Sequence, residues 1–251
     1  MQNSQIEVQK YGGTSVGNFE RIGKVAEHIK ECLTGAMGEK KIVAVVSAMD
    51  KTTDELIAQA NKLVPDPDQR ELDLLLHTGE IQSAVFLAMK LLNLGVKVRS
   101  FTAWQIGLET NARYGNAAIL GLRDKQLMLR LLKQFDVLVI TGFQGIAPGE
   151  TTEITTVGRG GSDAIAVALA VELEAACVIY TDVDGIYAVD PRVVENARRF
   201  RVITPAQMMG MYKAGAEVMM GRSVEIADRF GIHITVKLSP SFGASDGGTV
   251  I

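Results

Sequence analysis

Residues 157–187 read VGRGGSDAIAVALAVELEAACVIYTDVDGIY, and this stretch decides the fold class. A glycine-rich turn is followed by an apolar, alanine-rich helical segment and then by β-branched and aromatic residues typical of a buried strand. Ser162 and Asp163 suit the start of the helix as N-cap residues. A loop, a helix and a strand in this order form the repeating unit of parallel α/β sheets.

The same alternation runs along the rest of the chain. Runs typical of strands occupy residues 6–12, 41–49, 96–103, 136–145, 177–187 and 233–239. Helical patterns occupy residues 18–33, 52–64, 79–95, 123–135 and 162–176, and residues 203–231 contain two further helices that separate near Gly215. We therefore expect a three-layer α/β/α sandwich around a mainly parallel sheet, with ligands at the carboxyl ends of its strands.

Composition limits the classes of function. The chain has 251 residues and a formal net charge of −3, so it has no general attraction for nucleic acid or anionic membranes. The N-terminal residues lack a secretory pattern and no segment is a membrane span, so we expect a cytoplasmic protein. Cys32 and Cys177 lie too far apart to suggest a metal cluster or a disulfide scaffold. This length suits one α/β domain.

The glycine-rich turn is the first candidate site. Glycine allows left-handed backbone and lets N–H groups converge on an anion, and the N-terminus of the following helix favours negative charge. Arg159 adds a planar cation suited to a carboxylate or a phosphate. The turn predicts an anion site, with a plain surface turn and a solvated arginine as the alternative.

Two further strand ends carry polar side chains that would meet the first candidate site. Lys10 ends one strand, and Gly12 and Gly13 follow it as a phosphate-sized nest that matches neither the Walker loop nor the GxGxxG fingerprint. Ser47 and Thr53 follow the next strand, where Thr53 is also explicable as a helix N-cap. Alone, the segment KYGGTS is equally explicable as a turn.

Two more segments carry charge. Glu80, in LLHTGE, suits an ammonium ligand or is a solvated carboxylate at the start of a helix. A polar loop follows the strand of residues 177–187 and is long enough to wrap a nucleotide, although clustered Asp and Gly also make ordinary turns. Its candidate residues are Thr181, Asp182, Tyr187 and Arg192.

Taken together, these strings resemble the amino acid kinase family, and within it the catalytic domain of aspartate kinases. The similarity rests on VQKYGGTSV, VVSAM and KTTDEL, TGE, ITTVGRGGSD and YTDVDGIYAVDPR, and it extends over residues 8–251. It implies an α/β/α fold and ATP-dependent phosphorylation of the side-chain carboxylate of L-aspartate to 4-phospho-L-aspartate. It also implies Mg²⁺ bridging the phosphates, with no protein metal ligand assigned, and a homodimer.

The resemblance implies roles for the matched residues. Lys10, oriented by Asp163, would contact the transferring phosphoryl group, with Gly12 and Gly13 as N–H donors. Aspartate would be held by Ser47, Thr53, Glu80, Arg159, Gly160, Gly161 and Ser162, with Glu80 on the ammonium group and Arg159 on a carboxylate. ATP would be held by Thr181, Asp182, Tyr187, Arg192 and Lys213, beside the position of Glu217. A carboxylate acceptor needs no general base, so positioning and charge neutralisation would dominate catalysis.

Two positions depart from the family pattern. Glu217 stands where family members have a lysine that reaches the ATP phosphates, and a carboxylate there repels them. Lys213, one helical turn earlier, is the predicted substitute. Asp50 replaces a common glycine. Two alternatives therefore stay open: the same fold phosphorylating a different small amino acid or acid, and a ligand-binding regulatory pseudokinase.

The resemblance also divides the domain. Residues 1–165 would bind the acceptor and residues 166–251 the nucleotide. The chain ends at GGTVI, where family members continue into paired ACT domains, so we expect no ACT domain and no feedback inhibition by lysine or threonine through one.

Overall fold

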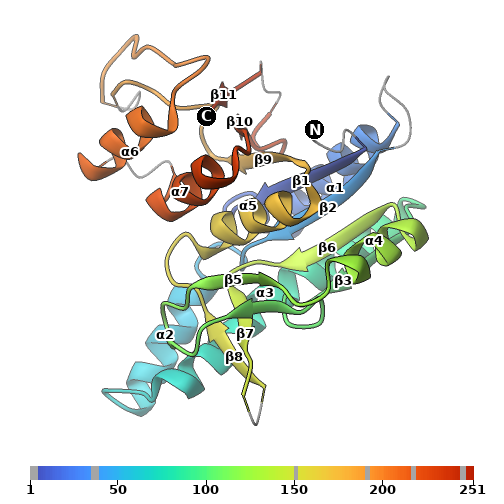
Figure 1. The fold of residues 1–251 in the computed structure, drawn as a ribbon, viewed down its shortest axis with the longest axis vertical. Coiled ribbons are helices and arrows are strands. Elements are labelled where there is room, and N and C mark those ends of the chain that lie inside the picture. Colours follow the sequence, from blue (N-terminus) through green and yellow to red (C-terminus); the bar gives the residue numbers. More distant parts are fainter. Residues whose placement is uncertain (1–4, 35–39, 150–151, 190–192, 216–218, 244–246) are drawn as a thin grey trace.

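The fold centres on a seven-stranded sheet (Figure 1). The structure is a computed structural model that describes residues 5–34, 40–149, 152–189, 193–215, 219–243 and 247–251. The strands are, in spatial order, β11 (Thr249–Val250), β10 (Ile234–Leu238), β9 (Ala176–Thr181), β1 (Ile6–Tyr11), β2 (Lys41–Val46), β6 (Val137–Thr141) and β3 (Val98–Phe101). All pair in parallel except β11, which runs antiparallel to β10. The carboxyl ends of six strands therefore share one edge.

Helices cover both faces of this sheet. One face packs on α1 (Phe19–Leu33) and α3 (Gln69–Asn93), with α2 (Thr52–Leu63) against α3. The other face packs on α4 (Lys125–Gln134), α5 (Gly161–Leu173) and α7 (Gly221–Phe230), with α6 (Pro205–Lys213) against α7. Two separate apolar clusters fill these layers, so the expected three-layer sandwich is confirmed.

A second sheet lies beside α3 and was not anticipated. Its strands are, in spatial order, β5 (Ile119–Leu122), β4 (Leu108–Thr110), β7 (Gln144–Ala147) and β8 (Glu153–Thr156). The single strand expected at residues 136–145 is wrong, because the chain turns at Phe143, whose φ is 67°, and passes from β6 in one sheet to β7 in the other. The turn brings the second sheet to the carboxyl edge of the first.

Two helix starts also differ from expectation. The helix α3 begins at Gln69 rather than residue 79, with the Asp68 side chain accepting from the Glu71 N–H as N-cap. The N-cap of α5 is Gly160, with φ 70° and no side-chain cap, so Ser162 and Asp163 lie inside the first turn instead of capping it. The side chains of both residues are therefore not used to cap α5.

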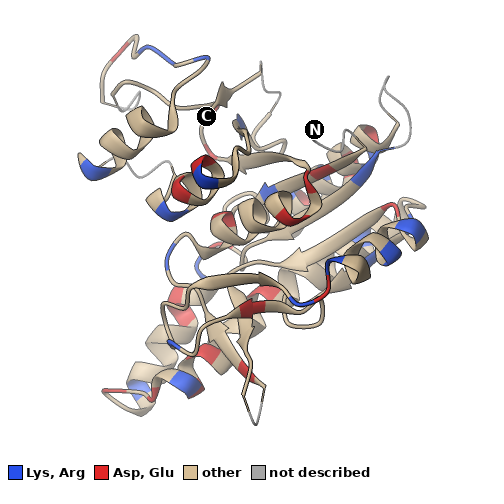
Figure 2. Ribbon diagram, in the orientation of Figure 1, with Lys and Arg blue, Asp and Glu red and all other residues tan. Residues whose placement is uncertain are grey.

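Acidic and basic residues are spread over the whole ribbon, and neither sign gathers in one region (Figure 2). Among the described residues, no helix is long and apolar enough to cross a membrane. Because the chain has a formal net charge of −3, any anion-binding site must be formed by nearby cationic and N–H groups and not by the overall charge.

Candidate active site

Lys10 and Asp163 form the centre of the site. Lys10 precedes the last residue of β1, Asp163 lies in the first turn of α5, and Nζ is 2.6 Å from Oδ1. Their side chains are only 12% and 11% exposed. A pair so poorly hydrated holds the ammonium group in one place, as expected for Asp163 orienting Lys10.

The Gly12–Gly13 turn lies directly over this ammonium group. A Cβ on Gly12 would lie 3.3 Å from Lys10 Nζ, and one on Gly13 would lie 2.7 Å from the Ala48 carbonyl oxygen, so only glycine fits at position 13. The Gly12 N–H donates to the Tyr180 carbonyl at 3.4 Å. Within the described part of the chain the Gly13 N–H has no acceptor, so of the two it is the donor open to an anion.

Glu80 is buried in the middle of α3 and is 2% exposed. The interpretation as a solvated carboxylate at a helix start is wrong, because α3 begins eleven residues earlier. Its Oε1 accepts the Ala48 N–H at 3.0 Å, while Oε2 has no hydrogen-bond partner among the described residues. Burial raises the pKa of Glu80 to about 8 against the opposing effect of that N–H. A buried carboxylate oxygen without a donor is a strong site for a cation.

The β2–α2 loop joins Glu80 to the Gly12–Gly13 turn. The Ser47 N–H donates to the Tyr11 carbonyl at 3.1 Å and the Asp50 N–H to the Gly13 carbonyl at 3.1 Å. Thr53 is half-buried in the first turn of α2, whose N-cap is Lys51 without a side-chain hydrogen bond. The N-cap interpretation of Thr53 is therefore wrong, and its hydroxyl is not engaged as a cap.

The glycine-rich turn of residues 158–161 lies near the same edge of the sheet. A Cβ on Gly142, the residue after β6, would collide with Ser162 Oγ, so Ser162 lies at the carboxyl edge of the sheet. Gly160 faces Met220 and Gly161 faces Val157, and neither has room for a Cβ. Arg159 is exposed, and among the described residues nothing pairs with its guanidinium. The turn thus presents an uncompensated cation beside a buried hydroxyl.

The region predicted to hold the nucleotide begins where β9 ends. The Thr181 hydroxyl donates to Asp182 Oδ1 at 3.1 Å, and Asp182 is exposed. Tyr187 donates to Asp184 Oδ1 at 2.6 Å, and Arg199 Nη1 lies 2.7 Å from Asp184 Oδ2. Asp184 therefore holds Tyr187 and Arg199 together in this loop.

Two predicted nucleotide residues, Arg192 and Glu217, lie outside the described residues. Lys213 is the last residue of α6 and is exposed. Lys10 and Asp163 contact each other directly. Ser47, Glu80 and Ser162 are attached to the same carboxyl edge of β1, β2 and β6 through Tyr11, Ala48 and Gly142, and Thr181 ends the adjacent strand β9.

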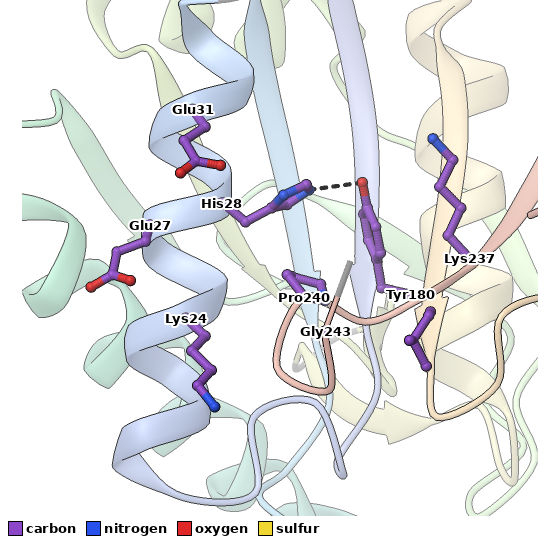
Figure 3. A pocket seen from close by; sticks show the side chains of 9 residues that line it. Lys24, Glu27, His28, Glu31, Tyr180, Lys237, Pro240 and Gly243 are labelled. Atoms are coloured by element: carbon purple, nitrogen blue, oxygen red, sulfur yellow. Dashed lines mark hydrogen bonds between the residues drawn. The ribbon is translucent and has the colours of Figure 1, made fainter. Parts of the chain in front are cut away.

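A separate cavity of about 450 Å³ lies on the α1 side, at the ends of β9 and β10 (Figure 3). In it, His28 of α1 points toward Tyr180, with Nε2 and the phenolic oxygen 2.9 Å apart. Tyr180 belongs to the apolar cluster of the α1 face, whereas Lys10 pairs with α5 on the other face. None of the described candidate site residues lines this cavity.

Residues 5–237 match the amino acid kinase family. The chain is 45% identical over 235 residues to an aspartokinase of Geobacillus stearothermophilus, covering 93% of this chain and 56% of the relative. It superposes on the crystal structure of aspartate kinase from Synechocystis with a TM-score of 0.83 and 41% identity, covering 96% of this chain and 39% of that one. For E. coli aspartokinase III in complex with aspartate and ADP the TM-score is 0.82 at 27% identity, covering 98% and 64%. The chain spans about half the length of the curated relatives it matches.

Proposed function

This chain belongs to the amino acid kinase family, and on that premise we propose that it transfers the γ-phosphoryl group of ATP to the side-chain carboxylate of L-aspartate, giving 4-phospho-L-aspartate. The observation that carries the proposal is the buried Glu80 carboxylate with its unpartnered Oε2. An ammonium group would supply the charge and the donors that this oxygen lacks. The similar E. coli aspartokinase III has been solved in complex with aspartate, an acceptor that carries such a group.

The acceptor is held at both ends in this proposal. Glu80 takes the α-ammonium group and Arg159, a cation with which no described residue pairs, takes the α-carboxylate. Ser47, Thr53 and Ser162 supply hydroxyls around it. The side-chain carboxylate is then directed at the edge above Lys10.

The reaction needs no general base, because the acceptor carboxylate is already ionised at neutral pH. Its oxygen forms a bond to the γ-phosphorus while the bond to the bridging oxygen of ADP breaks. Lys10, fixed by Asp163, and the open Gly13 N–H stabilise the phosphoryl oxygens as charge redistributes. Catalysis on this scheme is positioning plus electrostatics.

The nucleotide is assigned to the residues after β9. Thr181, Asp182, Tyr187 and Lys213 are described by the structure, whereas Arg192 and Glu217 are not. We propose that all six positions lie around the bound nucleotide. Asp182 is an exposed carboxylate, the oxygen donor that Mg²⁺ prefers, so it fits a metal that enters with the nucleotide. When bound, Mg²⁺ neutralises charge on the phosphates.

Acyl phosphate formation, trapped with hydroxylamine, tests the proposal. The chain is assayed with ATP and Mg²⁺ against L-aspartate, L-glutamate and succinate, which lacks the ammonium group. We expect aspartate to be preferred to succinate by at least ~10²-fold in kcat/KM, because a buried site built for a charged donor rejects an analogue without it. Equal rates with succinate would contradict the role of Glu80.

Two alternatives rest on specific residues. A different amino acid acceptor would give turnover with glutamate but not with aspartate. A pseudokinase would bind ATP without releasing ADP, and the Glu217→Lys variant would then recover turnover. Activity of the parent chain with aspartate would exclude both alternatives and leave Lys213 as the candidate cation at the phosphates.

The assembly and location of the protein are also proposals. We propose a homodimer in the cytoplasm, with residues 1–165 binding the acceptor and residues 166–251 the nucleotide. Light scattering after size exclusion would give about twice the chain mass of 27.1 kDa for a dimer. A mass equal to one chain would contradict it.

A further inference from the structure

Asp73 is a buried carboxylate to which the sequence drew no attention. It lies on α3 and is 1% exposed. Its oxygens accept the Gly115 N–H at 2.9 Å, the Thr156 N–H at 2.8 Å and the Thr156 hydroxyl at 2.7 Å. Three donors from two distant segments compensate one charge, so the carboxylate ties the β4–β5 loop and the end of β8 to α3.

The position of Asp73 relates it to the acceptor site. Asp73 and Glu80 are seven residues apart, which places them two turns apart on one side of α3. Thr156 lies three residues before Arg159. One rigid helix therefore carries both Glu80 and the attachment point of the turn that bears Arg159.

Arg222 ties the same backbone from the opposite side. It lies in the first turn of α7, and its Nη1 donates to the Ala117 carbonyl at 2.9 Å and to the Val157 carbonyl at 3.0 Å. The Ala117 N–H in turn donates to the Thr156 carbonyl at 2.8 Å. The planar guanidinium suits two fixed carbonyls better than an ammonium group would.

We propose that Asp73 and Arg222 are positioning residues that clamp the backbone of residues 115–117 and 156–157, and so hold Arg159 at a fixed place relative to Glu80. The inference rests on the proposed function, since it takes Glu80 and Arg159 as the two ends of the acceptor site. Neither positioning residue touches the acceptor. Their effect is transmitted through the turn.

The test uses graded variants of this clamp. Thr156→Val removes one of the three donors and keeps the side-chain shape, Thr156→Ser keeps the hydroxyl, and Arg222→Lys keeps the charge but not the fork. Misplacement of a binding group by about 1 Å costs ~10²-fold. We expect Thr156→Val and Arg222→Lys to raise the KM for aspartate ~10-fold or more, to leave the KM for ATP within about two-fold, and Thr156→Ser to restore the parent value.

The control is Thr110→Val in the same sheet. Thr110 Oγ1 and Thr155 Oγ1 share a buried hydrogen bond at 2.5 Å. Thr155 precedes Thr156 in the chain, but this hydrogen bond does not involve Asp73. The control variant should lower the melting temperature as Thr156→Val does and leave the KM for aspartate unchanged. An equal rise in KM in this control, or no rise in either clamp variant, would overturn the proposal.

Hydrogen exchange of residues 157–162 provides a readout without an acceptor. We expect Thr156→Val and Arg222→Lys, but not Thr110→Val, to speed exchange in this turn. If the parent chain shows no turnover but the variants show this exchange pattern, the proposed function is refuted and the clamp is supported. A parent chain with turnover and no difference in exchange would refute the clamp alone.

Discussion

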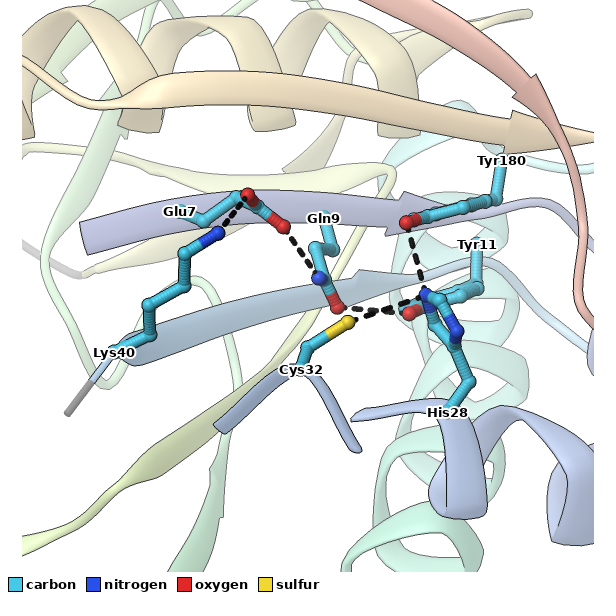
Figure 4. Close-up of polar contacts among 7 residues, drawn as sticks. All are labelled: Glu7, Gln9, Tyr11, His28, Cys32, Lys40 and Tyr180. Atoms are coloured by element: carbon cyan, nitrogen blue, oxygen red, sulfur yellow. Dashed lines mark hydrogen bonds and ion pairs between the residues drawn. The ribbon is translucent and has the colours of Figure 1, made fainter. Parts of the chain in front are cut away.

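The polar side chains on the α1 face of β1 are hydrogen-bonded to one another, whereas two charged groups at the carboxyl edge of the sheet have no partner among the described residues. Toward α1, Glu7 accepts from Lys40 at 3.1 Å and from Gln9 Nε2 at 2.6 Å, and Gln9 Oε1 accepts the Tyr11 hydroxyl at 2.8 Å (Figure 4). Tyr180, stacked on Tyr11 at 4.9 Å, contacts His28 in the same layer. These groups satisfy one another.

The carboxyl edge of the sheet is left incomplete instead, at Glu80 of α3 and in the turn before α5. Glu80 Oε2 has no partner among the described residues, and neither does the Arg159 guanidinium. Satisfied networks fix a core, whereas unsatisfied buried groups cost stability unless a ligand completes them. The difference predicts that mutations of the edge groups, Glu80 of α3 among them, change catalysis, whereas mutations within the network of Glu7, Gln9, Tyr11 and Tyr180 change only stability.

The largest effect is expected at Lys10. Lys10→Met should lower kcat ~10³-fold, since it removes the cation at the transferring group, and should also destabilise the fold by about 3–5 kcal/mol because Asp163 is left as an unpaired buried charge. Adding Asp163→Asn should restore much of the stability and none of the turnover. Calorimetry and the hydroxylamine assay separate the two effects, and joint recovery of both would show that Lys10 is only structural.

The next effect is expected at Glu80, where pH matters. Burial raises its pKa from 4.5 to about 8, so between these values the folded protein holds a proton that the unfolded chain has lost, and stability falls as pH rises. Glu80→Gln should remove this fall and raise the KM for aspartate ~10²-fold. In the parent, the KM for aspartate should decrease from pH 6 to 8, because the ammonium group binds the ionised form.

A pH profile identical in the parent and in Glu80→Gln would contradict this assignment. Succinate is the matched ligand control, since it has no ammonium group to interact with Glu80. Its KM should not decrease as pH rises from 6 to 8. Unfolding free energies from urea titrations at pH 5 and pH 8 give the stability part of the prediction independently of any assay.

Long periodic segments explain how much of the fold could be predicted. The helix α1 was expected at residues 18–33 and lies at Phe19–Leu33, because its apolar residues recur over four turns. The strands β4, β5 and β8 have only three or four residues each, too few for alternation to be recognised. Gly79 suggested a helix start, but it lies inside α3, where a Cβ would approach Ala48 Cβ to 2.9 Å.

The site was predictable where it is local in sequence. Lys10 lies near the end of β1 and the glycine pair follows that strand directly, so their place at the carboxyl edge followed from parallel topology. The GRGGSD turn follows β8 of the second sheet, so its meeting with Lys10 depends on how the two sheets pack. Asp73 was not predictable, because its partners Gly115 and Thr156 lie 42 and 83 residues away. Nor could the sequence indicate that Glu80 is buried with one oxygen unpartnered, since that depends on the packing of α3 against the β2–α2 loop.

The smallest effect is expected in the satisfied network toward α1. Tyr180→Phe removes the hydroxyl that contacts His28 Nε2 at 2.9 Å and keeps the ring stacked on Tyr11, so it should cost about 1 kcal/mol of stability. The Tyr180 carbonyl still accepts the Gly12 N–H, and kcat and both KM values should therefore stay within about two-fold of the parent. A ten-fold loss of kcat would mean that this network reaches the reacting groups through β9 and that the two faces of β1 are not independent.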